Sequence, residues 1–220
     1  MRAITLFFIL NLLLLGCFFS TVSCKSSIEE EHEYLSYIND ATHGLVKEKR
    51  VGDLIVQVKY LPSDLLAWKE LHTKKSTAQQ KDSISTLYDQ SITFLLSVSP
   101  DSSKGATDDI LYRGVSDQQS FKQRVSELNF DIERMLKLNA GNKEYYPALA
   151  VMENTYGTSS TKNFYIVFSA EDKKKIGTAY KELDLVFTDE LFATGINHFV
   201  FEQEAIEHIP SFNWKTTTIK

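Results

Sequence analysis

Two short runs of β-type residues lie close together in the first third of the chain. The runs mix apolar and charged positions over 44–50 and 54–60, and Gly52-Asp53 lies between them. Because Asp and Gly favour tight turns between half-buried strands, this pattern predicts a β-hairpin. Further along, the mostly apolar segment 92–98 predicts a buried strand, and the composition of 101–108 is typical of a loop.

Apolar residues at helical spacing predict two helices. In the first, Ser63-Asp64 supplies an N-cap signal ahead of apolar positions that fall on one face of 65–71. In the second, 116–119 has the spacing of a capping box, and apolar residues recur every three or four positions over 121–132. Alternation suited to a strand follows, so the change from helix to strand is expected within 130–136. The stretch between the two helices, before the strand at 92, is largely polar.

The second half of the chain is rich in strand-like runs. They occupy 136–138, 146–152, 163–169, 183–187 and 198–201. A turn at 139–142 makes the first two of these an expected pair. Because strands joined by short loops favour antiparallel pairing, the sequence predicts an α+β fold. We expect a mainly antiparallel sheet with helices packed on one face, in a single domain over 41–220.

The N-terminus has the layout of an export signal. One positive charge at Arg2 precedes an apolar run over 4–19, which gives way to small residues and then to Cys24. This order matches the charged, apolar and small-residue regions of a signal peptide. The apolar run is also short for a membrane-spanning helix, which needs about 20 residues. We therefore expect residues 1–23 to be a signal peptide.

The cysteine at the end of this segment indicates the type of signal. Val22-Ser23-Cys24 places small residues before a cysteine, and the chain becomes polar directly after it. This resembles the lipobox of bacterial lipoproteins cleaved by signal peptidase II, in which the cysteine thiol carries a diacylglycerol. The resemblance implies lipidation at Cys24, with Leu14 to Cys17 as the alternative motif. A multiply acylated cysteine is a stable membrane anchor.

An acidic cluster follows the predicted lipidation site. Residues 29–33 read Glu-Glu-Glu-His-Glu, which resembles the surface-export signal of Bacteroidota-type lipoproteins, although a solvated tether would have the same composition. We therefore expect residues 24–40 to be a lipidated acidic tether. The resemblance implies a protein of the bacterial cell envelope, anchored in the outer membrane or at the cell surface.

Composition and charge exclude several functions. The chain has 220 residues and a formal net charge of −5, and an acidic domain is a poor nucleic-acid binder. We therefore expect no nucleic-acid partner, and we expect the short basic runs at 47–50 and 173–175 to be solvated. Both cysteines lie within the first 24 residues. The predicted domain therefore contains no thiol, which excludes cysteine catalysis and thiolate metal sites there.

The search for catalytic chemistry yields only loose groupings. His198 and His208 flank Glu202 and Glu204, but this spacing fits no metal or acid–base template. Carboxylate pairs occur at 108–109 and 171–172, and aromatic residues suited to stacking are Tyr145, Tyr146, Tyr156, Phe212 and Trp214. Polar loops at 154–157 and 194–197 are places where binding residues tend to lie. No catalytic residue, cofactor or metal site is assigned.

Two functions are compatible with these observations. The first is a non-catalytic binding or assembly module held at a membrane, with a protein or glycan of the cell envelope as its partner. The alternative is a tethered hydrolase that acts on an envelope polymer or glycan. A deep pocket with convergent carboxylates or a histidine would favour the enzyme, whereas a flat aromatic patch would favour the binding module.

Overall fold

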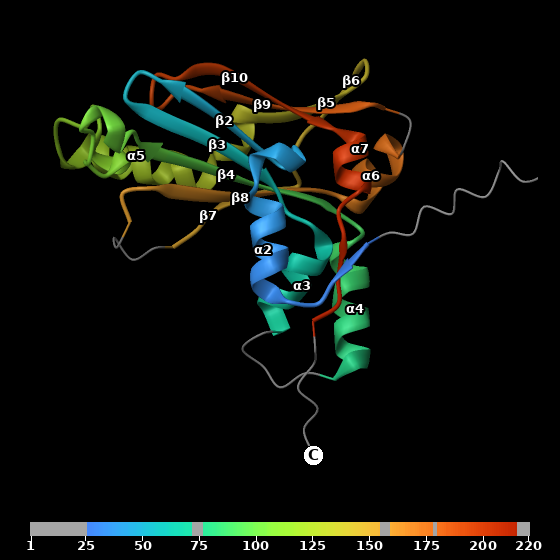
Figure 1. Ribbon diagram of the computed structural model, residues 1–220. Helices are drawn as coiled ribbons and strands as arrows, with labels where there is room; N and C mark the ends of the chain where they lie inside the picture. Colours follow the sequence, from blue (N-terminus) through green and yellow to red (C-terminus); the bar gives the residue numbers. More distant parts are fainter. Residues whose placement is uncertain (1–25, 72–76, 155–158, 178–179, 215–220) are drawn as a thin grey trace, which may run out of the picture.

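The frame of the protein consists of two antiparallel sheets. The computed structural model describes residues 26–71, 77–154, 159–177 and 180–214 (Figure 1). One sheet has five strands in the order β2 (Val46–Val51), β3 (Leu54–Tyr60), β4 (Ile92–Pro100), β8 (Lys162–Phe168) and β7 (Leu149–Met152). The other has four, in the order β10 (Gly195–Glu202), β9 (Glu182–Asp189), β5 (Leu136–Ala140) and β6 (Lys143–Tyr145).

Six helices lie around these sheets within the described ranges. They are α2 (Glu31–Asn39), α3 (Ser63–Leu71), α4 (Ala78–Tyr88), α5 (Gln118–Phe130), α6 (Ala170–Ile176) and α7 (Gln203–Glu207). Figure 1 shows α2, α3 and α4 gathered below one end of the strands, with α5 toward the other end. A short parallel pair, β1 (Ser27–Ile28) with β11 (Ser211–Phe212), joins the two ends of the folded chain. The predicted α+β fold with antiparallel strands is confirmed, although the strands form two sheets.

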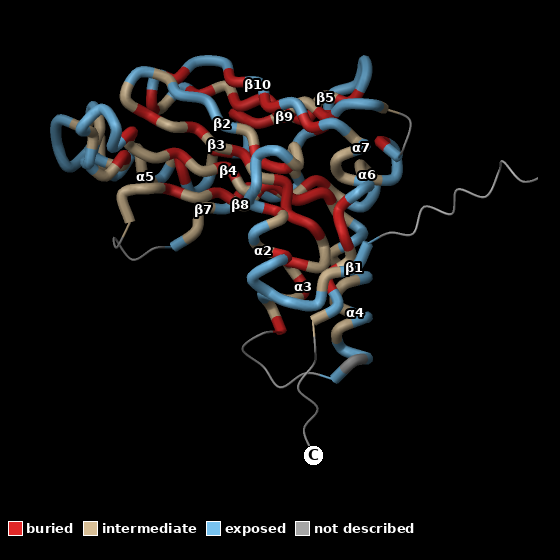
Figure 2. The backbone as a smooth tube through the Cα atoms, viewed as in Figure 1, coloured by how far each residue is buried: buried red, intermediate tan, exposed pale blue. Residues whose placement is uncertain are grey.

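The core lies between the two sheets. Along β3, β8 and β10, buried residues alternate with more exposed ones, so each strand turns one face inward (Figure 2). The ring of Phe94 on β4 lies 5.2 Å from that of Phe201 on β10, measured between centroids. Both side chains are fully buried. Burial of such large apolar side chains is the main favourable contribution to folding.

The predicted hairpin and four of the predicted strands are confirmed. Strands β2 and β3 pair antiparallel, and Gly52 in the turn between them has a φ of 61°, which glycine adopts readily. The runs at 92–98, 163–169, 183–187 and 198–201 correspond to β4, β8, β9 and β10. The loop at 101–108 contains one 3-10 turn, Ser102–Lys104.

The second predicted helix begins one residue later than its capping signal indicated. The N-cap of α5 is Asp117 and not Ser116, because the Asp117 carboxylate accepts from the backbone N–H of Ser120 at 2.8 Å. In return, the Ser120 hydroxyl oxygen accepts from the backbone N–H of Asp117 at 3.2 Å. The helix ends at Phe130, and a 3-10 segment (Ile132–Met135) leads into β5. The change from helix to strand therefore lies within the predicted interval.

The pairing predicted for 146–152 is wrong. Residues 143–145 form β6 and pair with β5, whereas 149–152 form β7 and pair with β8 in the other sheet. Pro147 lies between the two strands and has no N–H to donate to a ladder, so the chain leaves β5 there. The backbone N–H of Ala148 already donates to Val167 of β8, at 2.8 Å.

The predicted tether does not extend to residue 40. Residues 31–39 form α2, on which Tyr34 and Ile38 are 0% and 1% exposed, and Ser27 is already paired with β11. An acidic cluster is typical of a solvated segment, but Tyr34 and Ile38 lie one turn apart on α2 and face the core together. Cys17, Cys24 and the predicted signal peptide lie outside the described residues. Within the described ranges, no helix is long and apolar enough to cross a membrane.

If α2 belongs to the folded domain, truncating its buried face will destabilise the whole protein. We expect Ile38→Ala to lower the free energy of unfolding by about 2–5 kcal/mol, because a large buried side chain leaves a cavity. Ser36→Ala, at an exposed position of the same helix, is the control and should change it by less than about 0.5 kcal/mol. Urea denaturation followed by circular dichroism measures both. Equal, negligible changes would show that α2 is not part of the cooperative unit.

Candidate functional site

A pocket of about 270 Å³ lies where the helical segments meet the end of the strands. Its walls come from α2, the start of α3, the ends of α6 and α7, and the strand ends beside them. In Figure 1 this region lies between α6 and α7 above and α2, α3 and α4 below. The apolar part of the wall consists of Ile92, Ile176, Leu183, Ile206 and Ile209.

Local structure places the polar side chains of the pocket. Tyr60 is the last residue of β3, and Pro62 and Asp64 follow as the chain turns into α3. The turn is held by the backbone N–H of Leu61, which donates to Thr93 at 2.9 Å. On the opposite wall, Gln203 begins α7 directly after β10. The pocket is therefore built from segments that the sheets hold at their ends.

Tyr34 brings a buried hydroxyl to the wall of this pocket. Its ring stacks on Phe212 with centroids 4.4 Å apart and an interplanar angle of 7°. The side chain is fully buried, and its hydroxyl has no hydrogen-bond partner among the described residues. Burial, assisted by the negative charge of Asp64, raises the pKa of Tyr34. A buried hydroxyl without a partner costs free energy.

The charged and amide side chains of the pocket have defined partners. The Asp64 carboxylate accepts from the backbone N–H of Phe212 at 3.0 Å. The Lys173 ammonium pairs with Asp89 at 3.0 Å. The Gln203 amide donates to the Glu207 carboxylate at 3.0 Å.

Two of the unsatisfied buried polar atoms belong to residues of the pocket wall. Of the six such side-chain atoms found among the described residues, the pocket contributes the Tyr34 hydroxyl and Oε1 of Gln203. Two others, Oδ1 of Asn139 and Oδ1 of Asp184, lie together on the outer face of the four-stranded sheet. Native proteins leave few buried polar atoms unpaired, but these atoms are enclosed by the protein and present no surface to a ligand.

The structure does not bring the predicted histidine and glutamate residues together. His198 on β10 bonds through Nδ1 to Asp184 at 2.8 Å, and not to Glu202 or Glu204. His208 lies beyond α7, where Nδ1 contacts the backbone oxygen of Glu204 at 2.7 Å. Within the described ranges, no three His, Cys, Asp or Glu side chains are grouped so that they could hold a metal ion.

The His198–Asp184 pair is the closest approach to a catalytic base with an orienting carboxylate. The Asn139 amide donates to the same Asp184 oxygen at 3.2 Å, so three strands contribute to the cluster. However, the second ring nitrogen of His198, Nε2, has no nucleophile bonded to it among the described residues. Nucleophilic catalysis needs a hydroxyl or thiol within hydrogen-bond reach of the base. His198 is also half exposed, as expected on an open sheet face.

The other predicted candidates have structural partners. Asp109 binds the buried Lys162 at 2.8 Å, and Asp172 completes the capping box of α6. In the loop 194–197, the Asn197 side chain is buried and its amide donates to the Thr194 hydroxyl at 3.0 Å. Glu171 pairs with a lysine of its own helix. These groups are satisfied within the protein and stabilise its loops and helix ends.

The predicted aromatic residues are divided between core and surface. Phe212 and Tyr145 are buried, whereas Tyr146 is 63% exposed. Trp214 is partly buried and lies under the Lys81 ammonium, 4.3 Å from the ring centroid. Tyr156 lies outside the described residues, as does most of the loop 154–157. The aromatic residues therefore form no common patch among those that the structure describes.

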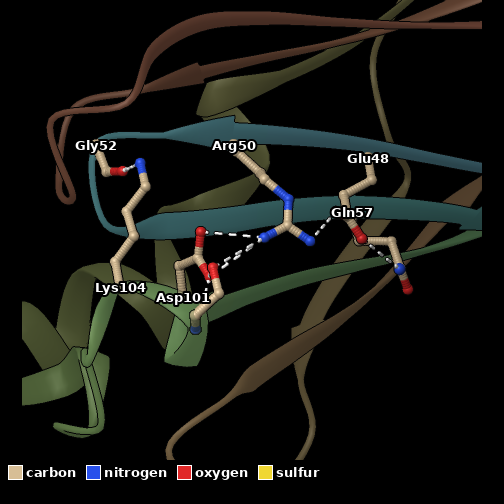
Figure 3. Close-up of polar contacts among 7 residues, drawn as sticks. Glu48, Arg50, Gly52, Gln57, Asp101 and Lys104 are labelled. Carbon is tan, nitrogen blue, oxygen red and sulfur yellow. Dashed lines mark hydrogen bonds and ion pairs between the residues drawn. The ribbon is translucent and has the colours of Figure 1, made fainter.

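A second polar cluster surrounds the β2–β3 hairpin, and its charged groups bond to one another and to the backbone. Figure 3 shows Arg50 of β2 reaching Asp101, with the guanidinium 3.1 Å from the carboxylate. Asp101 is 1% exposed and also accepts from the Ser103 hydroxyl, which with Arg50 lowers the pKa of Asp101. The Lys104 ammonium donates to the backbone oxygen of Gly52 in the hairpin turn. This network fastens the loop after β4 to the hairpin, and it leaves no group directed at a ligand.

The chain was compared with known proteins at the levels of sequence and structure. No family model matches it, and no curated protein matches it. A solved structure from Burkholderia pseudomallei K96243, described as a novel protein of unknown function, covers 81% of this chain and 86% of its own. The two are 9% identical, with a TM-score of 0.35. A likeness at this level carries no argument about function.

The environment of Tyr60 makes stability depend on pH in alkaline solution. Burial, and secondly the charge of Asp89, raises the pKa of Tyr60 to about 12. In the unfolded chain this phenol ionises near pH 10, so the unfolded state loses the proton first. The contribution of Tyr60 to stability is therefore present below about pH 10 and is lost as the pH rises towards about 12.

We expect Tyr60→Phe to flatten this alkaline decline. Urea denaturation from about pH 9 to about pH 11 should show the free energy of unfolding falling more steeply in the natural protein than in the variant. Tyr146→Phe, at an exposed position, should keep the natural slope. Parallel curves for all three proteins would contradict the assigned pKa.

Proposed function

We propose that this protein is a lipid-anchored, non-catalytic binding module of the bacterial cell envelope, and that the pocket beside Tyr34 takes a small ligand. The observation that carries the proposal is a concave site whose wall combines apolar side chains with charged and amide ones. Such a combination is the usual character of ligand sites in proteins. Its volume of about 270 Å³ suits a small molecule.

The anchor rests on the lipobox-like residues that end at Cys24. Ser27, three residues later, is already paired with β11, so the linking segment spans no more than about 10 Å at ~3.5 Å per residue. A lipid at Cys24 would therefore hold the domain against the membrane and would not let it extend away on a tether. The β1–β11 end of the domain would lie nearest the lipid. Close confinement of this kind raises the local concentration of a membrane-bound ligand or partner.

The tethered hydrolase is the second candidate, because the carboxylates of Asp64, Asp89 and Glu207 converge on the pocket wall. Paired carboxylates can perform acid–base hydrolysis. Each of the three is, however, bonded to another group of the protein. The pocket, at about 270 Å³, also has room for only a small part of a polymer or glycan chain. Turnover of glycan or ester substrates that is lost in Asp64→Asn would favour the hydrolase.

Lipidation can be tested by labelling with a fatty acid. In the producing bacterium, we expect Cys24→Ser to abolish incorporation and to leave the signal peptide uncleaved, because the thiol is the acylated group. Cys17→Ser is the matched control and should be labelled normally. Loss of the label in Cys17→Ser alone would assign the anchor to the alternative motif, and labelling of neither natural nor variant chain would refute lipidation.

The pocket can be tested without assuming a ligand. A mixed library of small neutral, cationic and anionic compounds should contain members that raise the Tm of the full-length protein in non-ionic detergent. We expect Ile206→Trp, which fills the pocket, to weaken their binding by at least about tenfold. Glu204→Trp introduces the same side chain at an exposed position of α7 and should leave binding unchanged. Absence of binding, or equal binding to both variants, would overturn the proposal.

A further inference from the structure

The sequence of β7 distinguishes it from the other strands at the borders of the two sheets. Strands β2, β6 and β10 each carry charged side chains, whereas β7 reads Leu-Ala-Val-Met over 149–152 and carries none. Charged side chains on a border strand discourage pairing with a further strand. Figure 1 shows β7 at the lower border of the five-stranded sheet, and among the described strands only β8 pairs with it. This border therefore lacks the charges that protect the other three.

The outer face of β7 is apolar and exposed. The side chains of Leu149 and Val151 are 50% and 43% exposed, whereas Ala150 between them is 8% exposed and faces the core. On the neighbouring β8 they lie opposite Val167 and Tyr165, which are half-buried. The two exposed side chains thus continue an apolar surface that crosses two strands and reaches the border. Contiguous exposed apolar surface of this kind marks sites of interaction.

The backbone of β7 has hydrogen-bonding groups directed away from the sheet. The N–H of Glu153, directly after β7, donates to the backbone oxygen of Asn163 on β8 at 2.7 Å. Because alternate residues of a strand bond to the same side, Leu149 and Val151 also direct their backbone groups at β8. Ala150 directs its N–H and C=O at the border, where no described strand pairs with it. Such groups are a template for another extended segment.

We propose that β7 pairs antiparallel with β7 of a second copy of this chain, which joins the two five-stranded sheets into one. In this pairing Ala150 lies opposite Ala150 of the second copy and exchanges both backbone hydrogen bonds with it. Leu149 then lies opposite Val151 of the second copy, and Val151 lies opposite its Leu149. These are closely spaced non-hydrogen-bonded pairs, so four exposed apolar side chains cover one another.

Charge and symmetry favour a second copy as the partner. The chain has a formal net charge of −5, so two copies repel each other unless the surfaces that meet are uncharged. Strand β7 meets this condition because neither copy brings a charged side chain to the pair. The flanking Glu153 of each copy lies at the opposite end of the pair, about 20 Å from its counterpart at ~3.4 Å per residue. Antiparallel pairing of identical strands also has two-fold symmetry, which is the commonest symmetry of protein dimers.

The association state of the natural and variant proteins tests the inference. Sedimentation equilibrium of the full-length protein in density-matched non-ionic detergent should show a monomer–dimer equilibrium. Because a four-residue strand buries little surface, we expect a Kd on the order of 10 μM. Val151→Lys places a charge against the second copy and should raise this Kd at least about tenfold. Ile196→Lys, at an apolar position of β10 that is 66% exposed, is the matched control and should leave the Kd unchanged.

Hydrogen exchange assigns the dimer to the border of β7. Measured by NMR, exchange of the Ala150 amide should slow as the protein concentration rises through the Kd, because pairing removes this N–H from water. The amide of Val151, which is directed at β8, is the internal reference and should not depend on concentration. In Val151→Lys, the Ala150 amide should exchange rapidly throughout. Should that variant fail to fold, Leu149→Lys at the other exposed position of the same face replaces it.

The possible outcomes decide whether a second copy is the partner. A protein that stays monomeric up to about 1 mM overturns the inference, as does a dimer of equal Kd in Val151→Lys and the natural protein. A dimer that Ile196→Lys weakens as much as Val151→Lys, or more, also contradicts it. So does exchange at Ala150 that is independent of concentration. None of these measurements involves the pocket, so ligand binding and dimer formation can each fail without the other.

Discussion

The ring of Phe94 is the contact on which both the sheets and the pocket depend. It projects from β4 and packs 5.2 Å from Phe201 of the facing sheet, so it joins the two layers. On its own sheet it lies edge-on to Phe168 and Tyr60, at 6.2 Å and 5.7 Å between centroids. Tyr60 is also a wall of the pocket. The same aromatic packing that buries the core therefore determines where one wall of the site stands.

The other side of the pocket is closed by the two ends of the folded chain. Tyr34, near the start, stacks on Phe212, near the end, and the backbone of Phe212 is bonded to Asp64 at the beginning of α3. These three residues lie far apart in sequence, and the stack of Tyr34 on Phe212 forms only when α2 docks. The acidic segment that the sequence predicts to be a tether thus contributes a buried surface through α2.

The treatment of buried polar groups distinguishes the pocket from the stabilising networks. Asp101 and Asp189 are almost fully buried, and each accepts several hydrogen bonds from neighbouring loops. The buried Lys162 is held by Asp109 and a backbone oxygen. These charges organise loops and require nothing further. The Tyr34 hydroxyl and Gln203 Oε1 have no such partners. The proposed ligand site is placed at their pocket because its wall is concave and partly apolar.

Sequence patterns by themselves determined the hairpin at Gly52, the starts of α3 and α5 to within a residue, and most strands, because periodicity, turns and caps are local properties. One local signal was overlooked: Thr77 and Gln80 form the capping box that starts α4. Only tertiary structure decided that 149–152 joins β8, that α2 is buried, and that residues of five distant segments share a pocket. Strand pairing and burial depend on contacts between residues remote in sequence, and a hydroxyl such as that of Tyr34 shows its lack of a partner only after those contacts have formed.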